Sequence, residues 1–230
     1  MRNPIPGRRA HCPQCLRPST ACICHCVQPV EHRTQVLLLQ HPMEAMHPKG
    51  TARLLHLCLP HSRMEVAEVW PEAELQALLH GRWSAALPAP ALTLLLYPPS
   101  PPDPSLPLQP PPAWEMADLA RLPEGSPLRL VVLDGTWRKS RKMLYLNPAL
   151  QQLPRLPLRD LPEGSYTIRK AHLPGQLSTL EASWAALHQL EPSQPALNGL
   201  LQAMATLQQQ YRHWASGDKN SPQDQLVKFS

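Results

Sequence analysis

The sequence has little phenylalanine, little glycine and no long apolar run. One Phe stands against six Trp and four Tyr, so nearly all aromatic side chains carry a polar atom. The longest apolar stretches have the length of a strand, which excludes a membrane-spanning helix. Residues 8–11 read Arg-Arg-Ala-His, where a secretory signal would need an apolar core. We therefore expect a soluble, intracellular protein of the cytoplasm.

Proline, by contrast, is abundant, with 30 residues against nine glycines. Each proline fixes one backbone dihedral and removes one hydrogen-bond donor, which leaves little room for long helices. Nine of the prolines lie in the stretch 98–112. We interpret that stretch as an extended surface loop and not as a domain boundary, because a strand pattern resumes after it.

The charge balance favours an anionic partner. Lys and Arg outnumber Asp and Glu by 22 to 17, which gives a net charge of +5 and a pI of about 9.0. This excess is typical of proteins that bind nucleic acid rather than membranes. We expect no membrane association, and no sequence feature indicates an obligatory protein partner.

Five of the six cysteines lie in a short N-terminal segment, where a Cys-x-x-Cys motif precedes Cys-x-Cys-x-Cys. In a reducing compartment, thiolates at this spacing hold a metal more often than they form disulfides. Two such groups can complete a tetrahedron around Zn²⁺, so residues 1–30 are predicted to form a small zinc knuckle with a closed, structural site. His25 or Cys26 could supply the fourth ligand instead, and structural or redox-active thiols are the alternative. The predicted ligands are Cys12, Cys15, Cys22 and Cys24.

From residue 31 to residue 214 the sequence alternates between strand and helix patterns, which implies one α/β domain. Such alternation predicts a mainly parallel sheet with helices on both faces. Residues 215–230 are polar and are expected to form a disordered tail. Strands are predicted at 35–40, 64–70, 92–97 and 130–133, and helices at 51–59, 71–80, 113–122 and 137–146.

Two further helices are predicted near the C-terminus. Ser178 and Glu181 form a capping box that opens a helix ending before Pro192. The last helix places one apolar stripe on a single face, and that pattern is typical of a core-facing helix. The stripe consists of Leu197, Leu200, Leu201, Met204, Leu207, Tyr211 and Trp214.

The stretch Leu133-Asp134-Gly135-Thr136-Trp137 is the most informative, because it puts a carboxylate where a buried strand ends. Thr136 can N-cap the following helix. A strand, a tight turn and a helix N-terminus place side chains at the carboxyl edge of a sheet, where open α/β folds bind ligands. Together with four cations in the helix, this indicates chemistry beside a polyanion; a solvated basic face is the alternative. The cations are Arg138, Lys139, Arg141 and Lys142.

A second polar cluster follows the first strand. His41, Glu44 and His47 would suggest a metal site only if the fold brought them together, and hydrogen-bonded loop packing is the preferred interpretation. Thr51, which follows Gly50, is expected to cap the next helix, whose free N–H groups can take a carboxylate or a phosphate.

Taken in order, these motifs resemble the DTW-domain family, over a match from about Cys12 to Tyr211. In one departure, Gly164 stands where the family has the first Ser of Ser-x-Tyr-x-x-Arg. The motifs are the cysteine pairs, Leu39-Gln40-His41-Pro42, His47-Pro48-Lys49-Gly50-Thr51, Leu96-Tyr97-Pro98, Asp134-Gly135-Thr136-Trp137, Tyr166-x-x-Arg169 and Ser178-Thr179-Leu180-Glu181-Ala182.

The resemblance implies a tRNA-uridine aminocarboxypropyltransferase of bacterial type. Its expected fold is SPOUT-like, with a C-terminal knot that binds S-adenosylmethionine. The reaction would transfer the 3-amino-3-carboxypropyl group to N3 of a tRNA uridine, giving acp3U and methylthioadenosine, with variable-loop position 47 as the expected target. A SPOUT-type RNA methyltransferase and a non-catalytic, zinc-containing RNA-binding module are the alternatives.

The resemblance also suggests roles for individual residues. Asp134 is the candidate general base or orients N3–H, with Thr136 beside it and Trp137 as wall or stacking partner for the base. The expected S-adenosylmethionine site consists of Leu96, Tyr97, Pro98, Leu133, Ser178 and Thr179. The expected tRNA contacts are Arg138, Lys139, Arg141, Lys142, Arg169 and Lys170, of which Arg169 could instead bind the donor's carboxylate.

Overall fold

A five-stranded sheet forms the centre of the computed structural model, which describes residues 10–158 and 177–216. All of its strand pairs are parallel, so the predicted mainly parallel sheet is confirmed. The strand order is β2 (Ser62–Val66), β1 (Gln35–Gln40), β4 (Leu128–Asp134), β3 (Leu92–Leu96) and β5 (Arg155–Leu156).

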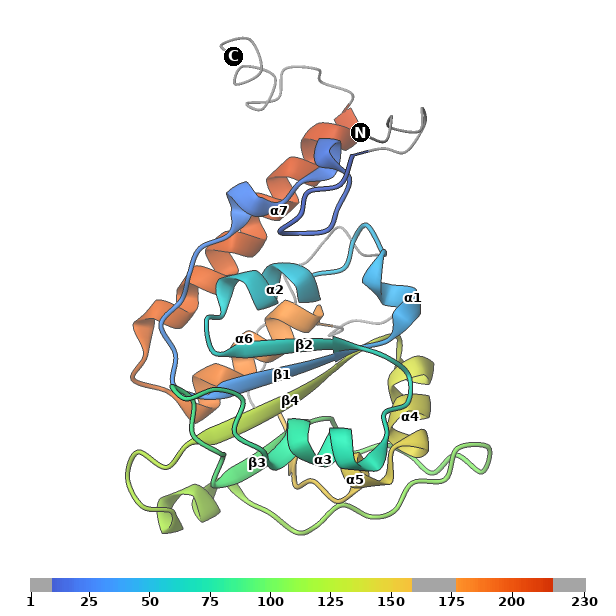
Figure 1. The fold of residues 1–230 in the computed structure, drawn as a ribbon, viewed down its shortest axis with the longest axis vertical. Coiled ribbons are helices and arrows are strands. Elements are labelled where there is room, and N and C mark those ends of the chain that lie inside the picture. The colour runs from blue at the N-terminus through green and yellow to red at the C-terminus, as the bar shows by residue number, and fades with distance from the viewer. Residues whose placement is uncertain (1–9, 159–176, 217–230) are drawn as a thin grey trace, which may run out of the picture.

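Helices cover both faces of the sheet, as predicted (Figure 1). Val36 and Leu38 of β1 point to one face and Leu37 and Leu39 to the other, and all four are fully buried. This two-sided burial explains why the strand reads as an unbroken apolar run. One face packs against α2 (Ala52–Cys58), α6 (Thr179–Leu190) and α7 (Gly199–Ser216), and the other against α3 (Glu72–His80), α4 (Trp137–Leu146) and α5 (Pro148–Gln151).

Several boundaries differ from the sequence prediction. The second strand was expected at 64–70, but β2 ends at Val66 and the chain then leaves the sheet. Trp70 instead packs under α3 and α5, where its backbone N–H donates to Asn147 Oδ1 at 3.1 Å. The helix expected at 113–122 is a short 3-10 helix, η3 (Met116–Arg121), while β5, α5 and the four-residue α1 (Pro42–Ala45) were not predicted.

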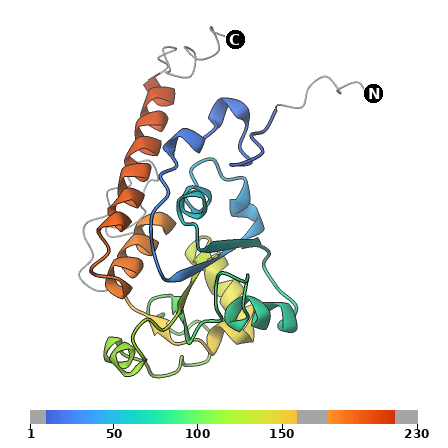
Figure 2. The ribbon, with the colours of Figure 1, turned by 60° about the vertical axis from the view of Figure 1, so that its left-hand side comes forward.

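The N-terminal cysteine segment, residues 10–30, packs along α7 (Figures 1 and 2). It contains two 3-10 turns, η1 (Ser19–Ala21) and η2 (Cys24–Cys26). Ile23 and Cys26 belong to the same apolar cluster as Leu200 and Leu207, and Gln210 donates to the Cys22 carbonyl at 2.9 Å. The short η4 (Pro195–Asn198) leads into α7. Burying the segment against the main core therefore couples its conformation to that of α7.

The amino end of β4, the central strand of the sheet, is fixed by a fully buried cation, Arg129. Its guanidinium donates to the Leu78 carbonyl at 2.8 Å and to the Gly81 carbonyl at 2.9 Å, at the C-terminus of α3. It also lies 3.8 Å from the ring centroid of Trp83. Burial lowers the pKa of Arg129 to about 10. Because helix C-termini favour positive charge, this cation ties α3 to the start of β4.

Some expectations fall outside the described residues. The expected strand-like piece with Arg169 and Lys170 lies within residues 159–176, and most of the expected tail lies in 217–230. The described residues do not show the expected C-terminal knot. Residues 215 and 216, where that tail was expected to begin, still belong to α7. Among the described helices, none combines the length and the apolar character needed to cross a membrane.

Candidate functional site

Asp134 is the last residue of β4 and is only 5% exposed. Its Oδ2 accepts a hydrogen bond from Gln40 Nε2 at 2.7 Å, and its Oδ1 accepts one from Thr179 Oγ1 at 2.5 Å. Its backbone carbonyl accepts from His41 N at 2.9 Å. The parallel register places Gln40 directly beside Asp134. One carboxylate therefore joins the ends of β1 and β4 to the first residue of α6.

The start of α6 is held by the predicted capping box. Ser178 Oγ accepts from Glu181 N at 3.2 Å, and Glu181 Oε2 accepts from Ser178 N at 2.7 Å. Leu180 N donates to Thr51 Oγ1 at 3.2 Å. Thr51 was expected to cap its own helix α2, but its side chain makes no such bond and serves α6 instead. This network aims the Thr179 hydroxyl at Asp134.

Thr136 caps α4 as predicted, because its side chain accepts from Lys139 N at 3.4 Å. Gly135 allows the tight turn before it: a Cβ there would lie 3.2 Å from the Lys139 Cβ and 3.4 Å from Ser140 N. Trp137 begins the helix and is 57% exposed. Its ring makes an edge-on contact with the buried Tyr97, at 6.0 Å between ring centroids. The Trp137 indole is thus held by its contact with Tyr97, while more than half of its surface stays exposed to solvent.

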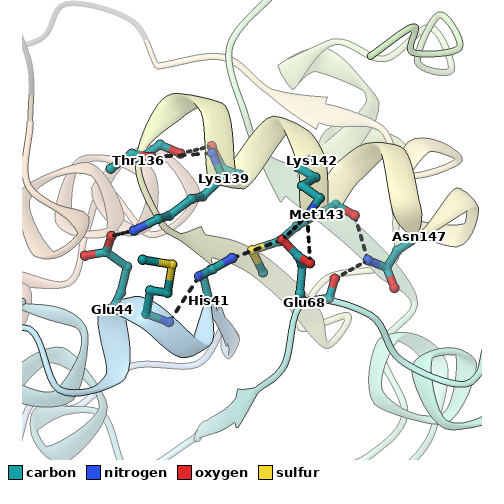
Figure 3. Close-up of polar contacts among 10 residues, drawn as sticks. His41, Glu44, Glu68, Thr136, Lys139, Lys142, Met143 and Asn147 are labelled. Carbon is teal, nitrogen blue, oxygen red and sulfur yellow. Dashed lines mark hydrogen bonds and ion pairs between the residues drawn. The ribbon is translucent and has the colours of Figure 1, made fainter. Parts of the chain in front are cut away.

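The four cations of α4 differ in their partners, and Figure 3 shows those of Lys139 and Lys142. Lys139 Nζ lies 2.8 Å from Glu44 Oε1, and Lys142 Nζ lies 3.0 Å from the Glu68 carboxylate. Arg141 donates to the carbonyls of Leu106 and Pro101, at 3.1 and 3.0 Å, within the proline-rich loop. Arg138 is exposed and makes no hydrogen bond or ion pair with the described residues. Among these four cations, Arg138 alone has no partner in the described part of the chain to give up when an anion arrives.

Glu68 organises the polar contacts behind this helix (Figure 3). His41 Nε2 lies 3.1 Å from Glu68 Oε1, while His41 Nδ1 accepts from Met43 N at 3.1 Å. Lys142 and His41 together lower the pKa of the Glu68 carboxyl. Asn147 Nδ2 donates to the Glu68 carbonyl at 2.9 Å. These contacts use His41 for loop packing, as the sequence interpretation preferred.

The residues expected to bind S-adenosylmethionine lie along the same edge of the sheet as Asp134. Leu96 ends β3 beside Val132 of β4, and Tyr97 and Pro98 follow it directly. Leu133 precedes Asp134, while Ser178 and Thr179 begin α6. Tyr97 is buried and carries the Arg155 guanidinium at 5.2 Å from its ring centroid. These residues share one location, but their role in binding S-adenosylmethionine stays a prediction.

The sequence reasoning assigned no role to Gln40 or Glu68. Gln40 stood inside a quoted motif, but its contact with Asp134 spans 94 residues of sequence. Glu68 lies beyond the end of β2, in a stretch expected to be strand, and nothing local pointed to its contacts with His41 and Lys142. The only signal available for Gln40 was a polar residue at the end of a fully buried strand.

The four cysteines predicted to bind metal come together. Their Sγ atoms all lie within 4.8 Å of one another, and no other group of this kind occurs in residues 10–158 and 177–216. His25 and Cys26 lie outside the group and contact each other at 3.4 Å. None of these cysteines forms a disulfide bond. The four clustered residues, which could hold a metal ion, are Cys12, Cys15, Cys22 and Cys24.

The thiols of this cluster differ in acidity. Backbone hydrogen bonds from Cys15 and Gln14 lower the pKa of Cys12 to about 6. Burial raises the pKa values of Cys22 and Cys24. Crowded thiols of this kind ionise together only when a cation neutralises them, which is the chemistry of a tetrahedral metal site.

Comparison with known proteins identifies the family. The DTW domain matches residues 9–212. The chain belongs to the DTW-domain family. This DTW domain is 31% identical over 204 residues to tRNA-uridine aminocarboxypropyltransferase 2 of Drosophila melanogaster, covering 85% of this chain and 72% of the relative. No solved structure matches it.

Other relatives carry the same kind of name. The DTW domain is 30% identical over 139 residues to tRNA-uridine aminocarboxypropyltransferase A of Arabidopsis thaliana, covering 60% of this chain and 51% of the relative. It is 28% identical over 219 residues to tRNA-uridine aminocarboxypropyltransferase 2 of Macaca fascicularis, covering 89% of this chain and 65% of the relative. It therefore spans about half to two thirds of the length of these two relatives.

Proposed function

We propose that this DTW domain transfers the 3-amino-3-carboxypropyl group of S-adenosylmethionine to N3 of a uridine in tRNA. The observation that carries the proposal is the family match over residues 9–212, with relatives named as tRNA-uridine aminocarboxypropyltransferases. The position of Asp134 at the carboxyl edge of a parallel sheet supports it, because open α/β folds bind their ligands there. The product is acp3U, at variable-loop position 47, and the expected compartment is the cytoplasm.

The reaction forms an N3–C bond and breaks a C–S bond. Methylthioadenosine leaves as a neutral thioether, so the leaving group needs no acid, and the N3 proton passes to a base. We propose Asp134 for this role or for orienting N3–H, with Thr136 beside it at the start of α4. The hydrogen bonds from Gln40 and Thr179 support either role, because they fix the carboxylate while the nucleophile and the chosen carbon are aligned.

The other binding roles follow the geometry of the same edge. The open face of Trp137 is our candidate for stacking on the uracil. Arg138, Lys139, Arg141 and Lys142 are proposed for backbone phosphates, with Arg138 the most available. A SPOUT-type knot, Arg169 and Lys170 belong to the proposal but not to the described residues. The donor site is proposed at Leu96, Tyr97, Pro98, Leu133, Ser178 and Thr179.

We further propose that the cysteine cluster holds structural Zn²⁺. Four sulfur ligands suit zinc, and a site with four protein ligands has no open position for catalysis. Its contribution is to fix the fold of residues 10–30 against α7.

The decisive experiment incubates purified protein with unmodified tRNA and S-adenosylmethionine, then identifies both products by mass spectrometry. Our proposal expects acp3U in the tRNA and an equal amount of methylthioadenosine. A methyluridine together with S-adenosylhomocysteine would identify a methyltransferase instead. Binding of tRNA without either product would identify a non-catalytic RNA-binding module.

A further inference from the structure

A pocket of about 270 Å³ lies beside the Asp134 network. It is enclosed by the cysteine segment, the turn at 47–50 and the end of α7. Gln40 lines this pocket and donates to Asp134 through its Nε2. A single side chain therefore separates the pocket from the carboxylate proposed for catalysis. Trp137 and Tyr97 do not line it.

The pocket contains a guanidinium that has no carboxylate partner among the described residues, with Cys15 as a neighbour in the lining. Arg53, the second residue of α2, lines the pocket half-buried and makes no hydrogen bond or ion pair with the part of the chain that the structure describes. The one carboxylate in the lining, Glu44, lies 2.8 Å from Lys139 Nζ and is thereby neutralised. A partly desolvated guanidinium in such a setting favours an anionic ligand, phosphate above all.

Exposed apolar side chains line the same pocket as this cation. Trp214 is 41% exposed, and its ring stands nearly perpendicular to that of Tyr211, with centroids 5.2 Å apart. Met46 and Leu16 are also exposed and line the same pocket. An indole supported by Tyr211 and a guanidinium in the same pocket match the two parts of a nucleotide, because bases stack on aromatic rings while phosphates pair with arginine.

One wall of the pocket is built in an uncommon way. Leu16 has φ of 60°, in the left-handed region that side chains other than Gly and Asn rarely adopt, and it follows Cys15 of the cysteine cluster. The next residue, Arg17, donates to Tyr211 Oη at 2.6 Å and to the Gly50 carbonyl at 2.7 Å. Tyr211 in turn donates to the Pro48 carbonyl. The wall is thus held in place by the cysteine cluster and by α7 together.

We propose that this pocket binds a nucleotide of the tRNA next to the target uridine, with its base against Trp214 and its phosphate on Arg53. The inference rests on the proposed function, because that function makes tRNA the substrate. It divides the work between two sites: Trp137 serves the target base, and the Arg53 pocket holds a neighbouring nucleotide close to Asp134.

The test compares Trp214→Ala and Arg53→Gln with wild type in binding to a fluorescent tRNA and to a short oligoribonucleotide. Trp214→Ala should weaken binding about 5- to 150-fold without changing its salt dependence. Arg53→Gln should weaken binding and reduce the log–log salt slope by about 0.7 to 0.9, the value for one phosphate contact. The matched control is Arg121→Gln, which removes an exposed arginine outside the pocket and should leave binding unchanged.

Two more measurements keep the result interpretable. Thermal melting identifies variants that have lost their fold, and Arg53→Lys, which keeps the charge, should retain part of the affinity. S-adenosylmethionine binding should be unchanged; a variant that loses it with tRNA affinity intact would assign the pocket to the donor and overturn the proposal.

If wild type makes acp3U but both variants bind tRNA like wild type, the pocket proposal fails alone. If wild type makes no acp3U while the variants still lose oligoribonucleotide binding, the proposed function fails and the pocket stands.

Discussion

At the scale of single residues, Asp134 is distinguished by what its carboxylate holds together. An ionised carboxylate only accepts hydrogen bonds, so it fixes Nε2 of Gln40 and the hydroxyl of Thr179 in their donor orientations. The same residue thus serves structure and proposed chemistry, and a useful substitution must separate the two.

Asp134→Asn makes that separation. Asn keeps one acceptor oxygen for Gln40, and its amide can donate to Thr179, whose hydroxyl can also accept, so the network survives. If Asp134 is the general base, the chemical step should slow by about 10²- to 10⁴-fold while tRNA and S-adenosylmethionine bind as before. Single-turnover rates across pH measure this. A smaller loss, with a rate that rises as uridine N3 deprotonates, would mean that Asp134 only orients N3–H; equal rates would remove it from the mechanism.

His32 gives a pH dependence of stability. Its Nε2 accepts from His61 N at 3.2 Å and its Nδ1 contacts the Thr34 carbonyl at 2.8 Å, an arrangement that requires the neutral ring. Burial lowers the pKa of His32, so the unfolded state binds more protons and stability rises with pH. His32 therefore contributes fully above about pH 6.5, and its contribution falls as pH drops below that value, by at most about 1.4 kcal/mol per pH unit.

Urea unfolding at pH 7.5 and pH 5.0 checks this expectation. Wild type should lose more stability between the two pH values than His32→Asn, although the variant is less stable at both. The exposed His188 provides the control, and His188→Asn should keep the wild-type difference. An unchanged difference in His32→Asn would place the pH sensitivity elsewhere, with the half-buried His56, whose pKa burial also lowers, as the next residue to test.

At the scale of elements, α4 combines an N-cap, an aromatic side chain and a basic face. Most cations of that face already bind partners within the protein. Lys139 and Lys142 are paired with Glu44 and Glu68, which attach the helix to the segments that follow β1 and β2. The partly exposed Lys142–Glu68 pair contributes little to stability, whereas Glu44 is buried beside Lys139. Both pairs set how readily each cation can turn to a phosphate.

The pair Arg138→Gln and Arg141→Gln tests that distinction. Arg138 has no partner within residues 10–158 and 177–216, so its replacement should weaken tRNA binding and reduce the salt slope by about 0.9 if it contacts a phosphate. Arg141 already donates to two carbonyls of the proline-rich loop, so its loss should change the slope less and the loop more. Titrations of tRNA at several salt concentrations measure both. Unaltered slopes in both variants would mean that this face is only solvated.

What the sequence allowed us to predict at this scale depended on local signals. The caps Thr136 and Ser178 were predictable because each one bonds within its own first turn. The contact of Thr51 with Leu180 was not, since the partners lie 129 residues apart. The two-residue strand β5 was missed because it has no period of its own and exists through pairing with β3. For the candidate site, the motif order located Asp134, but only the fold revealed the Gln40 contact and the Arg53 pocket.

At the scale of the whole molecule, the cysteine segment is a structural part of the domain. It shares its apolar cluster with α7, and Arg17 bonds to both Tyr211 and the Gly50 carbonyl. α7 also packs against one face of the sheet in this apolar cluster. Loss of metal from the cysteine cluster is therefore expected to affect the stability of the entire domain and the shape of the pocket beside Asp134.

Zinc removal should therefore destabilise the protein as a whole. If the four cysteines form a closed site, purified protein should carry about one zinc per chain, and chelation or Cys12→Ser should lower the melting temperature or the soluble yield, since metal binding energy contributes to folding. The matched control is Cys58→Ser, which removes a buried thiol outside the cluster and should leave the zinc content unchanged even where stability falls. Metal analysis by mass spectrometry decides the assignment: full zinc occupancy in a protein that carries both Cys12→Ser and Cys22→Ser would exclude this ligand set. A stable protein that binds tRNA normally after zinc loss would show that burial against α7 alone holds the segment and the Leu16–Arg17 wall in place.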